Sequence, residues 1–205
     1  MSQSMKRMIS VAKGDSPADL VLVNAKIVNT LSGDIEEGAI AVCDGMVAGI
    51  GGYRDGSEVA DIGGKYVVPG LIDGHIHPES SMLHIARYAE AVVPRGVSVI
   101  VTDLHEISNV TGLHGARYMI ECSEPLPLDL HFMVPSCVPA THLETAGAEL
   151  TADDISAALS WAETIGLGEM MNFPGVLFAD NNVLAKIEAA SGRAVSYTHL
   201  RAHET

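Results

Sequence analysis

GLIDGHIHPESSM, residues 70–82, ends an apolar run with two histidines, His75 and His77, flanked by Asp73 and Glu79. Side chains alternate between the two faces of a β-strand, so these four residues would share one face if the chain stayed extended. Imidazole nitrogens beside a carboxylate suit a divalent metal ion of borderline softness, such as zinc, manganese or iron. We therefore predict that His75 and His77 are metal ligands. Asp73 is expected either to hold a histidine tautomer or to cap the turn.

Composition limits the classes of partner. The chain has 205 residues, 47% of them hydrophobic and 19% charged, which is enough for one large domain or two small ones. Its formal net charge is −14, from 12 basic and 26 acidic residues. This charge argues against nucleic acid and against anionic membrane surfaces, because both bind basic patches.

Cysteine usage and hydropathy indicate a cytoplasmic protein. The three cysteines, Cys43, Cys122 and Cys137, are far apart and form neither a disulfide framework nor a CxxC knuckle. No apolar run reaches the roughly 18 residues of a membrane span. The first residues lack the continuous apolar stretch of a signal peptide.

Residue composition and hydrophobic pattern change along the chain and predict four regions. Residues 1–17 are expected to form a tail or a short amphipathic helix. Residues 18–69 contain short β-rich runs separated by Gly, Asn and Asp, which predicts a small β-sandwich-type domain of antiparallel strands. Residues 70–193 alternate strand and helix patterns, and residues 194–205 are interpreted as a non-native tail.

Residues 70–193 predict about four βα units of a parallel sheet with right-handed crossovers. A (β/α)8 barrel needs eight strands and about 250 residues, so this region reads as the first half of such a barrel. No GxGxxG loop follows the first strand, which disfavours a doubly wound nucleotide-binding sheet. The expected strands are 71–77, 97–103, 128–136 and 166–171, and the expected helices are 82–93, 110–123, 151–165 and 181–190.

The segment VSYTHLRAHET, residues 195–205, breaks this pattern where a fifth strand is due. We interpret it as the translation of a sequencing adapter. Its His199 and His203 have an HxxxH spacing, but we exclude them from metal binding on this interpretation. The natural sequence is then expected to end near Arg193.

Polar residues follow each expected strand, at the edge where a parallel barrel carries its active site. Glu169 is predicted to bridge two metal ions, and Asp103 to lie beside it as a second catalytic residue. Substrate contacts are predicted for Glu79, His105, Glu106 and Ser136, and for Glu79 a contact with the metal is an alternative. Solvated loops are the alternative for Glu79, His105 and Glu106.

The segment PGLIDGHIH resembles the first-strand signature of the amidohydrolase superfamily, metal-dependent hydrolases with a (β/α)8 barrel and a flanking β domain. Together, DGHIHPESSM, VPRGVSVIVTDLHEISNV, FMVPSCVPAT and GLGEMMNFPGV resemble the bacterial adenine deaminases. The resemblance runs from about Ala18 to Arg193.

This resemblance implies hydrolysis of adenine to hypoxanthine and ammonia, by attack of a metal-bridged hydroxide at C6. It implies a binuclear manganese or iron centre, with His75 and His77 on one metal and Glu169 shared. A purine base is the implied substrate, and a homo-oligomer is expected for the full-length protein.

The family's later histidine ligands and its last-strand aspartate would lie beyond Arg193, so we expect the fragment to be inactive and poorly folded alone. The alternatives are a deacetylase or cyclic-amide hydrolase, which often carry a carboxylated lysine where Glu169 stands, or a non-catalytic metal-binding module.

Overall fold

The computed structural model describes residues 3–192 and 194–195. The chain divides into two compact units, Met1–Pro69 and Gly70–Thr205. Within the described residues, no helix combines the length and the apolar character needed to cross a membrane.

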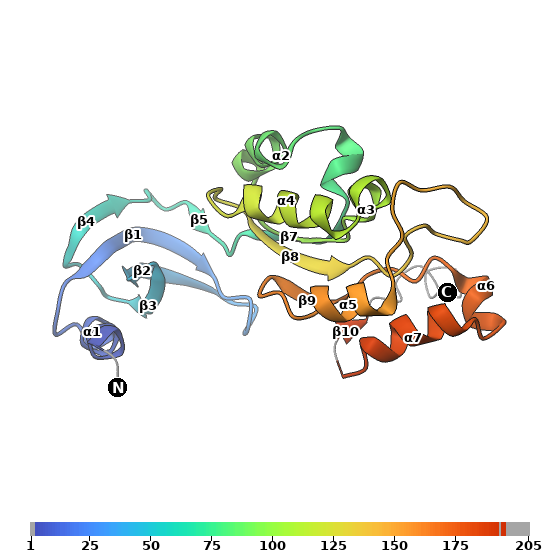
Figure 1. Cartoon of the computed structure of the whole chain (residues 1–205). Coiled ribbons are helices and arrows are strands. Elements are labelled where there is room, and N and C mark those ends of the chain that lie inside the picture. The colour runs from blue at the N-terminus through green and yellow to red at the C-terminus, as the bar shows by residue number, and fades with distance from the viewer. Residues whose placement is uncertain (1–2, 193, 196–205) are drawn as a thin grey trace. The chain divides into compact units, whose positions relative to one another are not determined.

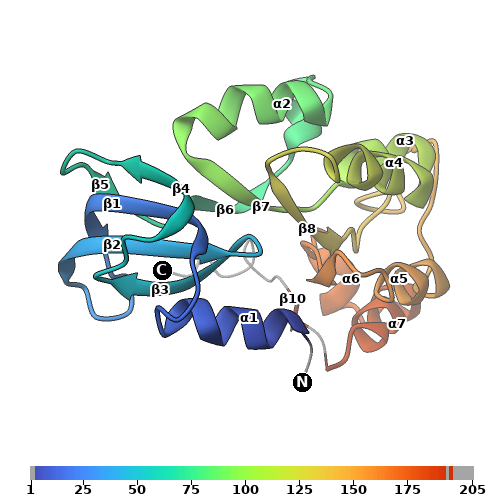
Figure 2. The same ribbon diagram turned by 90° about the vertical axis from the view of Figure 1, so that its left-hand side faces the viewer.

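The first unit is a five-stranded sheet with one helix (Figure 2). Its elements are α1 (Gln3–Ala12), β1 (Ala18–Val28), β2 (Ile35–Cys43), β3 (Met46–Gly51), β4 (Gly56–Asp61) and β5 (Tyr66–Val67). The strand order is β3-β2-β1-β4, and β5 also pairs with β1. β1, β2 and β3 are antiparallel, but β4 and β5 run parallel to β1. The prediction of antiparallel strands throughout was therefore wrong for these two, because an alternating pattern is the same in either strand direction.

Helix α1 packs on this sheet through Val11, which is buried with Val21 and Ala41. The guanidinium of Arg7 forms ion pairs with Asp19 and Asp44, and so joins the helix to the sheet. The residues expected to be a tail or a short helix thus contain a packed helix.

The second unit is a parallel five-stranded sheet with helices between its strands (Figure 1). Its strands are β6 (Leu71–Ile76), β7 (Val97–Thr102), β8 (Asp129–Val134), β9 (Thr164–Leu167) and β10 (Ala194–Val195), in the order β10-β9-β8-β7-β6. Its helices are η1 (Pro78–Ser81), α2 (Ile85–Val92), η2 (Val93–Arg95), α3 (His105–Thr111), α4 (Leu113–Ser123), α5 (Ala152–Ala158), α6 (Phe173–Leu177) and α7 (Asn181–Ala189). Consecutive parallel strands with helical crossovers confirm the predicted first half of a barrel.

Several boundaries differ from the prediction. Helix α5 ends at Ala158, and β9 begins at Thr164, before the predicted strand. The short helices α3 and α6 were not predicted. Gly112, with φ +67°, separates α3 from α4, so a break lies within the predicted helix 110–123. Helices of five to seven residues are too short to show a clear hydrophobic periodicity in the sequence, which is why they were missed.

Apolar side chains of the strands and helices form the main core of the second unit, and Cys137, Met170 and Val183 form a smaller cluster. Ile100, Phe132 and Leu167 come from successive strands and are fully buried, together with Ile120 of α4 and Ile155 of α5. Figure 1 shows α2, α3 and α4 on one side of β7 and β8. This packing brings the carboxyl ends of the strands to one edge.

Strand β10 continues the sheet by two residues, parallel to β9. The predicted non-native tail lies outside the described residues except for Ala194 and Val195. The interpretation of this segment as adapter-encoded stays a prediction.

Candidate metal centre

Two histidines and a glutamate meet at the carboxyl edge of the parallel sheet. His75 lies in β6, His77 directly follows it, and Glu169 lies two residues beyond β9. The Nε2 atoms of His75 and His77 are 3.1 Å apart, and His77 Nε2 is 3.4 Å from Glu169 Oε1. His75 Nε2 also contacts Glu169 Oε1 directly. One ligand atom from each residue lies within 4.8 Å of the others, a donor set that fits a divalent ion of borderline softness.

The ring of His77 is oriented by a backbone carbonyl. Its Nδ1 lies 2.6 Å from the carbonyl oxygen of Asp103, and a carbonyl oxygen only accepts hydrogen bonds. Nδ1 therefore carries the proton, which leaves the Nε2 lone pair directed at His75 and Glu169. A metal-binding histidine is commonly held in this way by an acceptor on its other nitrogen.

Asp103 holds the backbone of Glu169. Its side chain is 1% exposed, and its Oδ2 accepts a hydrogen bond of 2.8 Å from the Glu169 N–H. Gly168 makes this approach possible, because a Cβ there would lie 2.0 Å from Asp103 Oδ2. The Ser136 hydroxyl donates to the Glu169 carbonyl oxygen. The segment around Glu169 is thus fixed from β7 and from the loop after β8.

Asp73 and His75 both lie in β6, and Oδ1 of Asp73 accepts a hydrogen bond of 3.2 Å from the His75 N–H. After His77 the chain enters helix η1, so a helical turn and not strand alternation places Glu79. The chain therefore does not stay extended as far as Glu79, which was the condition for all four side chains to share one face.

Glu79, His105 and Glu106 form a second group near His77. His105 Nε2 lies 3.6 Å from Glu106 Oε2, and His77 Nδ1 lies 3.4 Å from the same oxygen. Ser80 donates a hydrogen bond to Glu106 Oε1. The sequence prediction did not include Ser80, although it directly follows Glu79.

Burial and neighbouring charges shift the pKa values in this second group. Burial raises the pKa of Glu79 to about 7, and the charge of Glu106 adds to the effect. Burial alone would raise the pKa of Glu106, but Ser80 and His105 outweigh it and lower that pKa. Burial lowers the pKa of His105, but neighbouring carboxylates, Asp103 first, outweigh it and leave the pKa raised.

Gly168 was also missed from the sequence. Gly168 directly precedes Glu169 in GLGEMM. A glycine next to a carboxylate at the end of a strand can mark a close approach of another group to the backbone, and this signal could have identified it. Its role depends on contact with Asp103, which is 65 residues away along the chain. Sequence spacing does not reveal that contact.

The matching family model is the Amidohydrolase family, and it covers residues 66–205. The chain belongs to this family. Two curated relatives are named adenine deaminase. That of Dehalococcoides mccartyi strain CBDB1 is 53% identical over 195 residues, or 95% of this chain and 34% of the relative. That of Oleidesulfovibrio alaskensis is 47% identical over 196 residues, or 95% of this chain and 34% of the relative. This amidohydrolase chain thus spans about a third of the length of its curated relatives.

Solved structures support the same fold. N-acyl-D-glutamate deacylase from Bordetella bronchiseptica aligns with a TM-score of 0.58 at 15% identity, over 86% of this chain and 43% of that one. A D-aminoacylase aligns with a TM-score of 0.51 at 21% identity, over 74% and 38%. At these identities the likeness concerns only the fold of the amidohydrolase chain.

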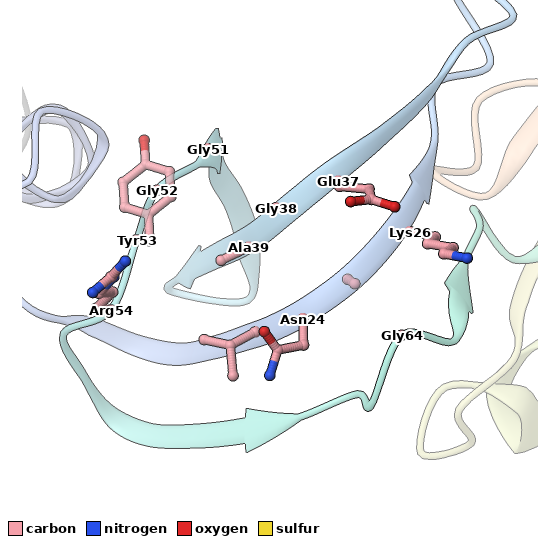
Figure 3. A pocket seen from close by; sticks show the side chains of 12 residues that line it. Asn24, Lys26, Glu37, Gly38, Ala39, Gly51, Gly52, Tyr53, Arg54 and Gly64 are labelled. Atoms are coloured by element: carbon pink, nitrogen blue, oxygen red, sulfur yellow. The ribbon is translucent and has the colours of Figure 1, made fainter.

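A large hollow of the first unit lies apart from these histidines in the sequence. It has a volume of about 610 Å³, and Figure 3 shows Lys26, Glu37, Tyr53 and Arg54 on its wall among several glycines. Its lining contains no histidine, so it does not supply the metal ligands of this amidohydrolase. The first unit also contains a cluster of possible metal-binding groups, formed by Asp19, Cys43 and Asp44. All three side chains contact the Arg7 guanidinium, which supplies their positive charge.

Proposed function

We propose that this chain is part of an adenine deaminase, which hydrolyses adenine to hypoxanthine and ammonia. The observation that carries the proposal is identity of 53% to a protein named adenine deaminase across 95% of the chain. His75, His77 and Glu169, which meet at the candidate metal centre, support it. The first relatives are about three times longer, so the activity is proposed for the complete protein.

His75, His77 and Glu169 are the proposed metal ligands, with Glu169 shared within a binuclear centre of manganese or iron, or alternatively zinc. A divalent metal ion held by these residues would activate water for attack on an electrophilic carbon near neutral pH. For adenine that carbon is C6. The chain's own contribution is to orient the His77 ring through the Asp103 carbonyl and to hold the Glu169 carboxylate beside both rings.

Glu169 is proposed as a catalytic residue because its carboxylate faces the imidazole nitrogens and can exchange protons with water at the centre. Asp103 is proposed as a positioning residue that acts through the backbone of Glu169. Glu79, His105, Glu106 and Ser136 remain proposed substrate contacts. Ser136 is 1% exposed, and its hydroxyl donates to the Glu169 carbonyl.

A cytoplasmic location remains part of the proposal, supported by three free cysteines, Cys43, Cys122 and Cys137. Assembly of the complete protein into a homo-oligomer also stays a prediction.

A chimera tests the proposed function. This chain replaces the matching 195 residues of the Dehalococcoides mccartyi relative, and the product is assayed with Mn²⁺ for ammonia release from adenine. We expect turnover by the chimera and at least a hundredfold loss in its His75→Ala and Glu169→Gln variants. A folded chimera that leaves adenine intact but hydrolyses an N-acyl amino acid or a cyclic amide would reject the deaminase in favour of another amidohydrolase.

The same variants separate an enzyme from a non-catalytic metal-binding module. A module would retain its metal content after Glu169→Gln, whereas the proposed centre loses metal because Glu169 is a ligand. Metal content is measured on the purified chimera and on the variant by elemental analysis.

A further inference from the structure

Five buried polar atoms close to His77 lack a hydrogen-bond partner among the described residues. They are both carboxylate oxygens of Glu79, Oε2 of Glu106, Nδ1 of His105 and Oδ1 of Asp103. Asp103 is 1% exposed, and its Oδ1 points at His105 Nδ1 from 3.4 Å. Burial of polar atoms without partners is unfavourable, and more so for carboxylates, so this concentration indicates a missing positively charged partner.

No lysine or arginine among the described residues forms an ion pair with Asp103, Glu106 or Glu79. Within the described part of the chain, the ion pairs of Asp103 and Glu106 are formed with histidines only. Ser80 satisfies Oε1 of Glu106, and Oε2 is left facing His77 and His105. The charge of Glu106 acts on the partly buried Glu79 carboxylate, and two neighbouring carboxylates are stabilised by a cation between them.

This group lies on the other side of the His77 ring from the proposed metal ligands. His77 Nε2 faces His75 and Glu169, whereas Nδ1 faces the Asp103 carbonyl and Glu106. The ring of His105 lies 4.5 Å from that of His77 between centroids. The two nitrogens of one imidazole point in different directions, so one ion cannot occupy both places.

The distances suit a bound cation. Ligand atoms that each lie about 2.0–2.2 Å from a metal ion are separated by roughly 3–3.6 Å. His105 Nε2 and Glu106 Oε2 are 3.6 Å apart, and both oxygens of Glu79 remain available. An imidazole with two carboxylates is a ligand set for manganese, iron or zinc.

We propose that His105, Glu106 and Glu79 bind an additional divalent cation, separate from the centre at His75, His77 and Glu169. Binding of this ion does not depend on the proposed function. A second part of the proposal does rest on the proposed function: His105, Glu106 and Glu79 then contact the purine through this bound ion.

Counting bound Mn²⁺ tests the proposal on the whole 205-residue chain, stripped of metal and titrated by equilibrium dialysis with detection by electron paramagnetic resonance. We expect one Mn²⁺ fewer in Glu79→Gln/Glu106→Gln than in the unmodified chain. His75→Ala should leave the additional site filled. Glu90→Gln/Glu121→Gln, a pair of exposed glutamates in α2 and α4, is the matched control and should keep the full count.

An unchanged count in Glu79→Gln/Glu106→Gln would overturn the proposal, as would loss of all Mn²⁺ in His75→Ala. His105→Asn is a milder second variant with the same expected loss, and circular dichroism checks that each variant folds. Repeating the count in the adenine deaminase chimera separates the two proposals. A chimera that binds the additional ion but leaves adenine intact rejects only the proposed function.

Discussion

At the scale of single residues, the candidate centre depends on contacts that hold a ligand without being ligands themselves. The Asp103 carbonyl sets the tautomer of His77, and the Asp103 carboxylate holds the Glu169 N–H. Gly168 leaves room for that carboxylate. A side chain that orients a metal ligand commonly changes metal affinity 10–100-fold when it is removed.

Asp103→Ala should weaken Mn²⁺ binding about 10–100-fold, because the Glu169 backbone loses its acceptor. Asp103→Asn keeps an oxygen acceptor and should restore most of the affinity. Mn²⁺ titration followed by electron paramagnetic resonance measures both, with thermal melting as a check of folding. Equal losses in the two variants would show that the carboxylate charge, and not the acceptor position, is what matters.

Gly168→Ala should destabilise the second unit by about 1–3 kcal/mol, because its Cβ would lie 2.0 Å from Asp103 Oδ2 and 3.0 Å from the Val134 carbonyl. Urea denaturation gives the change in the free energy of unfolding. Gly74→Ala is the matched control, since a Cβ there meets nothing within 4 Å. If Gly168→Ala is as stable as the control, the close approach of Asp103 is not a constraint.

At the scale of elements, helices α5 and α7 each begin at a side-chain cap. Thr151 and Asp154 form a capping box at the start of α5. Asp180 caps α7 by accepting from the backbone N–H groups of Asn182 and Val183. Caps stabilise helices of this length, which are too short to be stable alone.

Thr151→Ala should lower the free energy of unfolding by about 1 kcal/mol at neutral pH, because helix α5 loses its N-cap side chain. Hydrogen bonds from the Thr151 backbone and hydroxyl lower the pKa of Asp154 below 3.8. A carboxylate with a lowered folded-state pKa contributes stability above its unfolded pKa and loses it as the pH falls through the folded value. The difference between the variant and the unmodified chain should therefore shrink below about pH 4.

Urea unfolding followed through the single tryptophan, Trp161, measures this difference across pH. Trp161 follows α5 by three residues and stacks on Phe132, so its fluorescence reports on this region. A difference that stays constant from pH 7 to acid would argue against a role for the Asp154 charge.

At the scale of the whole molecule, the described sheet of the second unit is open. β6 pairs only with β7, and its Leu71 and Ile72 are 57% and 67% exposed. A closed barrel has no such edge strand, and exposed strand edges favour association. About two thirds of the length of the relatives lies outside the part that this chain matches.

We expect the chain alone to release no ammonia from adenine in the presence of Mn²⁺ and to associate as its concentration rises. The chain spans about a third of the length of its curated relatives, and the open sheet exposes apolar surface. An ammonia assay and analytical ultracentrifugation measure the two effects. Turnover close to that of the chimera would refute the expectation of inactivity.

The sequence predicted the parallel strands of the second unit and the polar residues that gather at their carboxyl ends. Both predictions rest on the hydrophobic periodicity of short segments, which can be read from the sequence alone. His75, His77 and Glu169 could be placed together on that basis. The parallel pairing of β4 and β5, the helical turn at Glu79 and the contact of Gly168 with Asp103 could not. Those features arise where segments distant in sequence pack against each other, and close packing, not local propensity, selects which atoms meet.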